Sequence, residues 1–213
     1  MSRRPELIET VRIRGGVAPL WGHHLARLFT ACRAVGVEPP RSLPIPAGGP
    51  DRIHRVLVSS RGVEVSERPV GSADPVRLVT SAVRHEPYPH KTTERKQFDL
   101  ARAEAEASGA DDGVLLSAGG WVAETAIWGL YWWDDGRLAA PPMDFGILDS
   151  VARRRLAELT GEIAERRGNP GQVCGSGVFV ANAVRGVVPV ASVDGRAVVL
   201  SRETTALAGA FWG

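Results

Sequence analysis

The chain has 213 residues, of which 44% are hydrophobic and 23% are charged, and its formal net charge is +2. This length suits one large domain or two small domains packed together, with ample material for a hydrophobic core. The balanced charge, with arginines scattered among acids, gives no basis for a nucleic-acid surface. No apolar run approaches the roughly 18 residues that a membrane-spanning helix needs.

The cysteines and the N-terminus indicate the cellular compartment. Cys32 and Cys174 are two isolated thiols without metal-ligand spacing, so no metal site is expected. The two cysteines could form a disulfide, but the pattern favours reduced thiols. The first residues, "MSRRPELIETVRI", lack the apolar core of a signal peptide. We therefore expect a cytoplasmic protein that binds neither membrane nor nucleic acid.

The first half of the chain predicts an α+β arrangement. Residues 6–13 read as a strand, 17–21 as a short return strand after a glycine turn, and 23–36 as a helix that Gly36 ends. The proline-rich residues 38–50 predict a loop. Three antiparallel strands then follow, at 52–60, 62–69 and 75–83.

The second half alternates helices and strands. The expected elements are a helix at 94–109 ended by Gly109, strands within 113–141 with turns at 119–120 and 135–136, a loop feeding a long helix within 143–168, and short strands within 177–200. We expect a small α+β N-terminal domain at 1–84, a linker at 85–90 and a larger α/β C-terminal domain at 91–213.

Lysine occurs only at positions 91 and 96, whereas the other 24 of the 26 basic residues are arginine. Lys91 and Lys96 read most simply as two solvated lysines at the start of a helix. The alternative is chemical: a lysine amine can lose its proton when it is buried or crowded by cations, which arginine does not do. The residues that follow along the chain favour the chemical alternative.

Glu124 lies in an otherwise apolar, tryptophan-rich strand, "GWVAETAIWGLYWW". A buried carboxylate is costly unless a cation pairs with it. An edge strand with Glu124 facing water would avoid that cost. The functional alternative is a fixed anion that holds a proton on a heteroaromatic ring nitrogen.

Two other features suit a phosphate group. In "GILDSVARRRL", Ser150, Val151 and Ala152 would offer backbone N–H groups at the positive end of a helix dipole, although Ser150 also reads as a plain helix N-cap. Arg27 in "HHLARL" has two interpretations: its side chain snorkels outward to water, or its guanidinium donates paired hydrogen bonds to a phosphate. One ligand that needs an amine, a carboxylate and a phosphate site is pyridoxal 5′-phosphate (PLP).

The order of these motifs resembles the class IV aminotransferases, the fold type IV group of PLP-dependent enzymes, which includes D-amino acid aminotransferases. The resemblance rests on four stretches that span nearly the whole chain: "IETVRIRGGVAPLWGHHLARL", "HKTTERKQFDLARAEAEASGADDGVLLSAGGWVAET", "PPMDFGILDSVARRRL" and "VFVANAVRGVVPVASVDG". It implies two α/β domains with the cofactor in the cleft between them, a homodimer and a small-molecule amino substrate.

The resemblance also implies roles for single residues. Lys91 matches the lysine that attaches the cofactor, and Lys96 matches no functional position. Glu124 matches the partner of the pyridinium nitrogen. The remaining matches concern the phosphate and are Arg27, the start of the helix at Ser150, Val151 and Ala152, and the loop at Asn182 and Ala183.

The motifs "KTTER" and "ANAVRGVVPV" resemble the 4-amino-4-deoxychorismate lyase branch, which implies a lyase that supplies folate biosynthesis. A branched-chain or D-amino acid aminotransferase is the alternative within the family. Departures from the family pattern are Gly129 in place of asparagine, Ser150 and Ala152 in place of glycine and threonine, and only "MSRRPE" before the first strand. They leave open a cofactor-free binding subunit.

Overall fold

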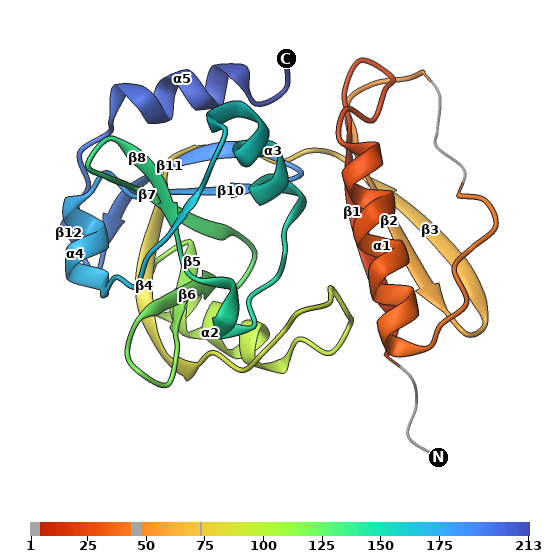
Figure 1. Ribbon diagram of the computed structural model, residues 1–213, viewed down its shortest axis with the longest axis horizontal. Helices are drawn as coiled ribbons and strands as arrows, with labels where there is room; N and C mark the ends of the chain where they lie inside the picture. The colour runs from red at the N-terminus through yellow and green to blue at the C-terminus, as the bar shows by residue number, and fades with distance from the viewer. Residues whose placement is uncertain (1–4, 44–47, 73) are drawn as a thin grey trace. The chain divides into compact units, whose positions relative to one another are not determined.

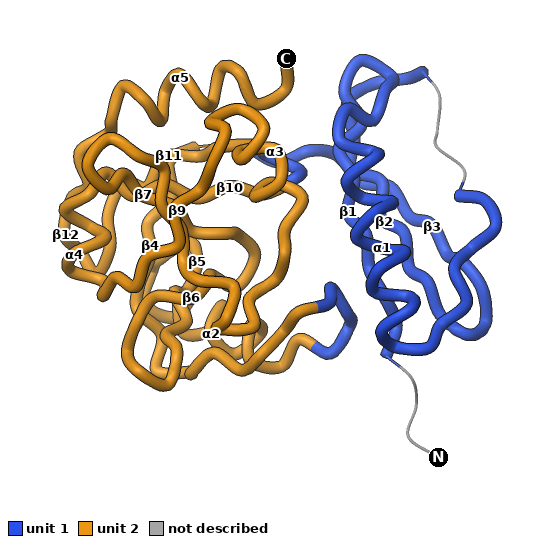
Figure 2. The backbone as a smooth tube through the Cα atoms, in the orientation of Figure 1, with its two compact units in different colours: residues 1–72, 90–94, 183–185 blue, residues 73–89, 95–182, 186–213 orange. Residues whose placement is uncertain are grey.

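The computed structural model describes residues 5–43, 48–72 and 74–213. Residues 44–47 of the predicted proline-rich loop and residue 73 of a predicted turn lie outside this range. The chain divides into two compact units (Figure 2). Unit 1 comprises Met1–Ser72, His90–Glu94 and Ala183–Arg185, and unit 2 comprises Ala73–Pro89, Arg95–Asn182 and Gly186–Gly213. The domain boundaries expected from the sequence stay a prediction.

Unit 1 is a three-stranded antiparallel sheet with one helix (Figure 1). Its elements are β1 (Leu7–Ile13), α1 (Trp21–Val35), β2 (Arg52–Ser59) and β3 (Gly62–Arg68). Leu28, Ala31 and Cys32 of α1 pack with Leu7 of β1, because they recur at helical spacing and so share one face. Gly36 ends the helix with a φ of 69°, which a glycine adopts without strain.

The return strand predicted at 17–21 is wrong. Arg14 and Val17 form only an isolated bridge across the two glycines, and α1 already begins at Trp21. Both glycines of this turn have positive φ, 55° at Gly15 and 79° at Gly16. The chain therefore reverses within four residues and passes directly into the helix.

Unit 2 is built on a nine-stranded mixed sheet in the described part of the chain, with the strand order β6-β5-β4-β11-β10-β7-β8-β9 and with β12 paired to β11. Its strands are β4 (Val76–Arg84), β5 (Asp112–Leu116), β6 (Val122–Thr125), β7 (Gly129–Asp134), β8 (Arg137–Ala140), β9 (Ala164–Glu165), β10 (Phe179–Asn182), β11 (Gly186–Val193) and β12 (Arg196–Ala197). Its helical elements are α2 (Lys96–Ala107), η1 (Met143–Phe145), α3 (Val151–Thr160), α4 (Pro170–Gly175) and α5 (Arg202–Ala210).

The predicted antiparallel pairing of residues 75–83 with the preceding strand is wrong. β4 instead pairs in parallel with β5 on one side and with β11 on the other. Its side chains Val76 and Leu78 are buried in the main core of unit 2, so β4 belongs to that sheet. β3, by contrast, is exposed along its whole length.

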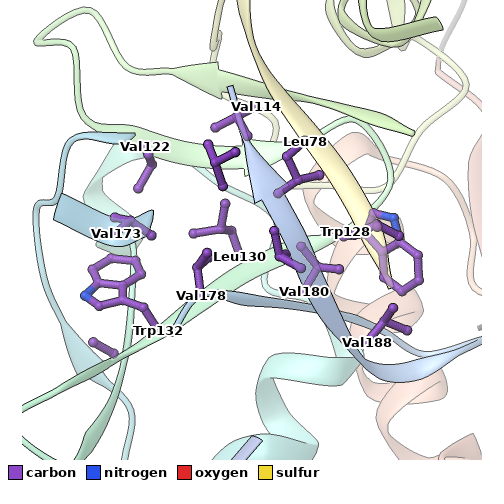
Figure 3. Packing of buried hydrophobic residues seen from close by; sticks show 14 of the residues in the cluster. Leu78, Val114, Val122, Trp128, Leu130, Trp132, Val173, Val178, Val180 and Val188 are labelled. Atoms are coloured by element: carbon purple, nitrogen blue, oxygen red, sulfur yellow. The ribbon is translucent and has the colours of Figure 1, made fainter. Parts of the chain in front are cut away.

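The main core of unit 2 contains two of the four tryptophans of the tryptophan-rich stretch. Trp128 and Trp132 are buried together with Leu130, Val180 and Val188, as Figure 3 shows. Burying such aromatic side chains removes large apolar areas from water. The predicted tight turn at 135–136 joins β7 and β8, and both of its residues have positive φ, 48° and 76°.

The helix predicted within 143–168 is shorter than expected. α3 starts after Ser150, which caps it by accepting a hydrogen bond from Arg153 N, and it ends at Gly161, whose φ is 79°. Helices α4 and α5 have no counterpart among the elements predicted from the sequence.

Both cysteines have free thiols. Within the described ranges, no cluster of three or more His, Cys, Asp or Glu side chains is suited to hold a metal ion. None of the helices in those ranges combines the length and apolar character needed to cross a membrane.

Candidate active site

Lys91 lies in a short segment that runs beside β1 in unit 1. The Ile8 amide donates to the Lys91 carbonyl at 2.8 Å, and Leu7 and Thr92 form an antiparallel bridge. These backbone contacts hold the lysine segment against the strand that carries Glu9. The side chain of Lys91 is half-buried.

Glu9 forms a buried cluster with two residues of α1. His24 Nδ1 lies 2.6 Å from Glu9 Oε2, and Arg27 donates from Nε at 2.9 Å and from Nη2 at 2.5 Å. Burial alone would raise the pKa of Glu9, but the charge of Arg27 and the hydrogen bond from His24 outweigh it and lower this pKa to about 2. Glu9 is therefore a carboxylate at neutral pH.

His24 is neutral in this cluster. Burial lowers its pKa, and the positive charges of Arg27 and Lys91 act in the same direction, against the attraction of Glu9. A neutral imidazole that donates Nδ1–H to Glu9 keeps Nε2 as an acceptor. That buried Nε2 finds no hydrogen-bond partner among the described residues.

The geometry excludes one of the two interpretations of Arg27. Arg27 does not snorkel outward: it is 7% exposed and bonds Glu9 through two nitrogens. Two of the five guanidinium N–H groups of Arg27 donate to Glu9, which holds the guanidinium rigidly. The other N–H groups can donate to another acceptor. Its role as a phosphate ligand stays a prediction.

Glu124 lies on β6, an edge strand of the unit 2 sheet, yet it is only 8% exposed. Its Oε1 lies 2.8 Å from Nε2 of the buried His85. The water-facing alternative is therefore wrong, and the side chain that contacts the buried Glu124 is His85. Sequence reasoning missed His85, which lies 39 positions away in the segment "HEPYP".

The turn that follows Glu124 is fixed by Asp112, a buried carboxylate on β5. Asp112 Oδ2 accepts from the Thr125 hydroxyl at 2.6 Å and from the Ile127 amide at 3.2 Å. Arg95 adds a hydrogen bond to the Ala126 carbonyl at 2.5 Å. Glu124 also pairs with Leu115 in the strand register, so β5 holds both this residue and the turn that follows it.

The start of α3 has the form predicted for an anion site. The amides of Val151 and Ala152 occupy the first turn, where no intrahelical acceptor exists. The Ser150 side chain accepts from Arg153 N at 3.1 Å. Val151 and Ala152 are buried, so any anion bound there would meet N–H groups shielded from bulk water.

The predicted residues fall into two groups. Lys91, Arg27 and Ala183 belong to unit 1, whereas Glu124, residues 150–152 and Asn182 belong to unit 2. Asn182 ends β10 and its Nδ2 donates to the Ile127 carbonyl at 3.4 Å.

The residues present fit PLP chemically. The cofactor requires an amine for attachment, an acceptor for its ring N–H and donors for its phosphate. Lys91 is the candidate amine. Glu124 meets His85 through Oε1, which leaves Oε2 able to accept. The first-turn amides of α3 are donors suited to a phosphate.

Comparisons with known proteins identify the family of the chain. The family model described as amino-transferase class IV matches residues 54–193. A comparison with curated proteins found no match.

Solved structures share the fold. A branched-chain aminotransferase from the archaeon Thermoproteus uzoniensis, determined with norvaline, is 19% identical with a TM-score of 0.87, covering 97% of this chain and 84% of its own. A protein provisionally assigned as 4-amino-4-deoxychorismate lyase, from Legionella pneumophila, is 19% identical with a TM-score of 0.82, covering 97% and 91%. A PLP-bound hypothetical aminotransferase from Mycobacterium tuberculosis is 19% identical with a TM-score of 0.85, covering 98% and 88%.

The chain belongs to the class IV aminotransferase family and has the mixed α+β architecture of fold type IV. It is a PLP-dependent enzyme of that family. These findings confirm three predictions from the sequence: the family resemblance, the fold class and the cofactor.

Proposed function

We propose that this enzyme is a 4-amino-4-deoxychorismate lyase, which converts its substrate into 4-aminobenzoate and pyruvate. The observation that carries the proposal is the context of Lys91, "KTTER", which with "ANAVRGVVPV" resembles the lyase branch of the family. The fold shared with a protein provisionally assigned this activity is compatible with it. The product would serve folate biosynthesis.

The proposal assigns a role to each predicted residue. Lys91 attaches the cofactor and acts as the catalytic base and acid. Glu124 accepts the ring N–H, with His85 fixing the carboxylate. The phosphate is held by Arg27, by the α3 start at Ser150, Val151 and Ala152, and by the loop at Asn182 and Ala183.

The chemistry divides between cofactor and protein. When bound, PLP supplies an electron sink for the charge left at the substrate carbon. Lys91 Nζ takes the proton from the carbon that bears the substrate amino group. The ether C–O bond then breaks, the ring becomes aromatic, and the same amine returns a proton to the three-carbon fragment, which leaves as pyruvate. The Glu124 side chain would accept the hydrogen bond from the ring N–H.

A direct test supplies the purified holoenzyme with 4-amino-4-deoxychorismate. We expect 4-aminobenzoate and pyruvate in equal amounts, and no product from the Lys91→Ala variant. The Lys96→Ala variant is the matched control, because it removes the only other lysine and should retain turnover. Absence of both products with a PLP-loaded enzyme would reject the lyase assignment.

Aminotransfer is the second candidate, favoured by the similarity to the branched-chain enzyme of Thermoproteus uzoniensis. In that reaction Lys91 would again take the proton from the substrate carbon, and PLP, when bound, would carry the amino group from the donor amino acid to an acceptor keto acid. Branched-chain and D-amino acid donors, each with 2-oxoglutarate, test it. A protein that takes up no PLP would instead favour a cofactor-free binding subunit.

We further propose that the enzyme acts as a cytoplasmic homodimer on its small amino substrate. Light scattering of the purified holoenzyme tests the assembly. A mass near twice 22.8 kDa is the expected result, and a monomer that retains full turnover would contradict it.

A further inference from the structure

Tyr131 is a fully enclosed side chain beside the start of α3. It lies on β7, is 2% exposed, and stacks on Phe179 with ring centroids 5.5 Å apart. Its hydroxyl oxygen lies 3.4 Å from Ser150 Oγ. A phenylalanine would supply the same stacking, so the hydroxyl calls for a separate explanation.

Gly129 makes room for that hydroxyl. A Cβ atom added at Gly129 would lie 2.7 Å from the Tyr131 hydroxyl oxygen and 3.1 Å from its ring. Any other residue at 129 would therefore push the tyrosine away. The departure of Gly129 from the family pattern and the position of Tyr131 are thus one structural feature.

Counting protons assigns the direction of the hydrogen bond. Tyr131 and Ser150 each have one hydroxyl proton, and their single mutual contact uses only one of the two. If Ser150 donated, the Tyr131 proton would be buried without an acceptor among the described residues, which is the costlier arrangement. Burial is the largest effect on this hydroxyl and raises the pKa of Tyr131 to about 12. The hydroxyl therefore keeps its proton at neutral pH.

Ser150 is then left as a donor. Its oxygen accepts from Tyr131 and from Arg153 N at 3.1 Å, which occupies both acceptor positions. Its own proton has no acceptor among the described contacts. Ser150 is only half-buried, so a ligand beside the first turn of α3 can receive that proton.

We propose that Ser150 donates its hydroxyl proton to the phosphate of PLP and that Tyr131 is the positioning residue that makes Ser150 a donor. The proposal rests on the assignment of the α3 start as the phosphate site. It explains how this chain holds a phosphate although Ala152 offers no hydroxyl. The hydroxyl of Ser150, two residues before Ala152, replaces the missing donor.

The test compares the dissociation constants of PLP and of pyridoxal, which lacks the phosphate, by quenching of tryptophan fluorescence. Ser150→Ala should weaken PLP binding about 3- to 10-fold and leave pyridoxal binding unchanged. Tyr131→Phe should also raise the dissociation constant of PLP. The double variant should match Ser150→Ala, because both changes remove one donor.

Two controls separate this effect from general destabilisation. Tyr88→Phe alters the other tyrosine, which packs on Phe98 in a different cluster, and should change neither constant. Ser150→Thr keeps the hydroxyl and the cap, and should preserve the preference for PLP over pyridoxal.

The remaining outcomes are distinguishable. If Tyr131→Phe and Ser150→Ala bind PLP as the wild type does, or lose affinity for PLP and pyridoxal equally, this proposal is wrong while the proposed function stands. If the wild type itself binds no PLP, both fail.

Discussion

At the scale of single residues, the carboxylate of Glu9 is tightly constrained. It is 2% exposed and bonds both His24 and Arg27. A buried ion pair contributes little net stability relative to apolar residues, but removing one partner leaves the other charge buried without compensation. The sequence places Glu9 inside a strand without indicating its partners, because both lie on a helix 15 and 18 positions away.

We predict that Glu9→Gln lowers the free energy of unfolding at pH 7 by about 3–5 kcal/mol. The pH dependence has a definite sign. The pKa of Glu9 is lowered from 4.5 to about 2 on folding, so its stabilisation is present above pH 4.5 and is lost as the pH falls toward 2. Urea unfolding across that window should show a component in the wild type that the variant lacks.

Glu106→Gln is the matched control for this prediction. Glu106 forms an exposed pair with Arg102 one turn away on α2, and such pairs contribute little. Equal losses in the two glutamine variants would contradict the special role of burial at Glu9.

Glu124 gives a prediction on activity. Glu124→Gln keeps the size of the side chain and its contact with His85 but removes the negative charge proposed to hold the ring proton. We expect the variant to retain bound PLP and to lose about 100-fold or more in kcat. Absorbance of the bound cofactor and steady-state kinetics check this. A variant with wild-type turnover would remove Glu124 from its proposed role.

How far the site is predictable from sequence depends on chain distance. The apolar neighbours of Glu124 indicate burial without excluding a water-facing edge strand, and burial in turn requires a partner. The identity of that partner does not follow from these neighbours, because His85 reaches Glu124 only through the parallel pairing of β4 with β5. The same reason hides Tyr131, whose hydroxyl contact with Ser150 is set by the packing of α3.

At the scale of elements, the packing of α2 on β5 depends on a close approach at Gly113. A Cβ atom there would lie 2.5 Å from the Ala101 carbonyl oxygen of the helix. We predict that Gly113→Ala lowers the free energy of unfolding by about 1–3 kcal/mol, because backbone must shift to admit the methyl group. Thermal or urea unfolding measures the change.

Gly22→Ala is the control for this substitution. Gly22 lies in the first turn of α1, and a Cβ atom there meets nothing within 4 Å. Alanine should leave stability unchanged or raise it slightly. If both alanine variants were equally stable, the proposed close contact at Gly113 would be wrong.

The existence of most elements follows from local pattern, whereas their partners do not. Apolar spacing marks α1, and Gly36 marks its end. The same reasoning marks residues 75–83 as a strand but assigns them to the wrong sheet, since an alternating pattern does not specify which strand lies alongside. The sequence pattern predicts a longer helix than α3, because it continues past Gly161, the residue at which the helix ends.

At the scale of the whole molecule, motif order carries more information than any one motif. The lysine, the glutamate and the helix start are each ambiguous alone. Their succession along the chain indicates the class IV aminotransferases, and the match over residues 54–193 confirms that family. The substrate depends on side chains that the shared fold does not determine, so the lyase assignment depends on the assay proposed above.

The most direct test of the account is the site of cofactor attachment. The holoenzyme is reduced with borohydride, digested, and analysed by peptide mass spectrometry. With only two lysines in the chain, the result is unambiguous. We predict a pyridoxyl-phosphate group on Lys91 and an unmodified Lys96; a modification found on Lys96 alone, or on neither lysine of a PLP-loaded protein, would contradict the central claim.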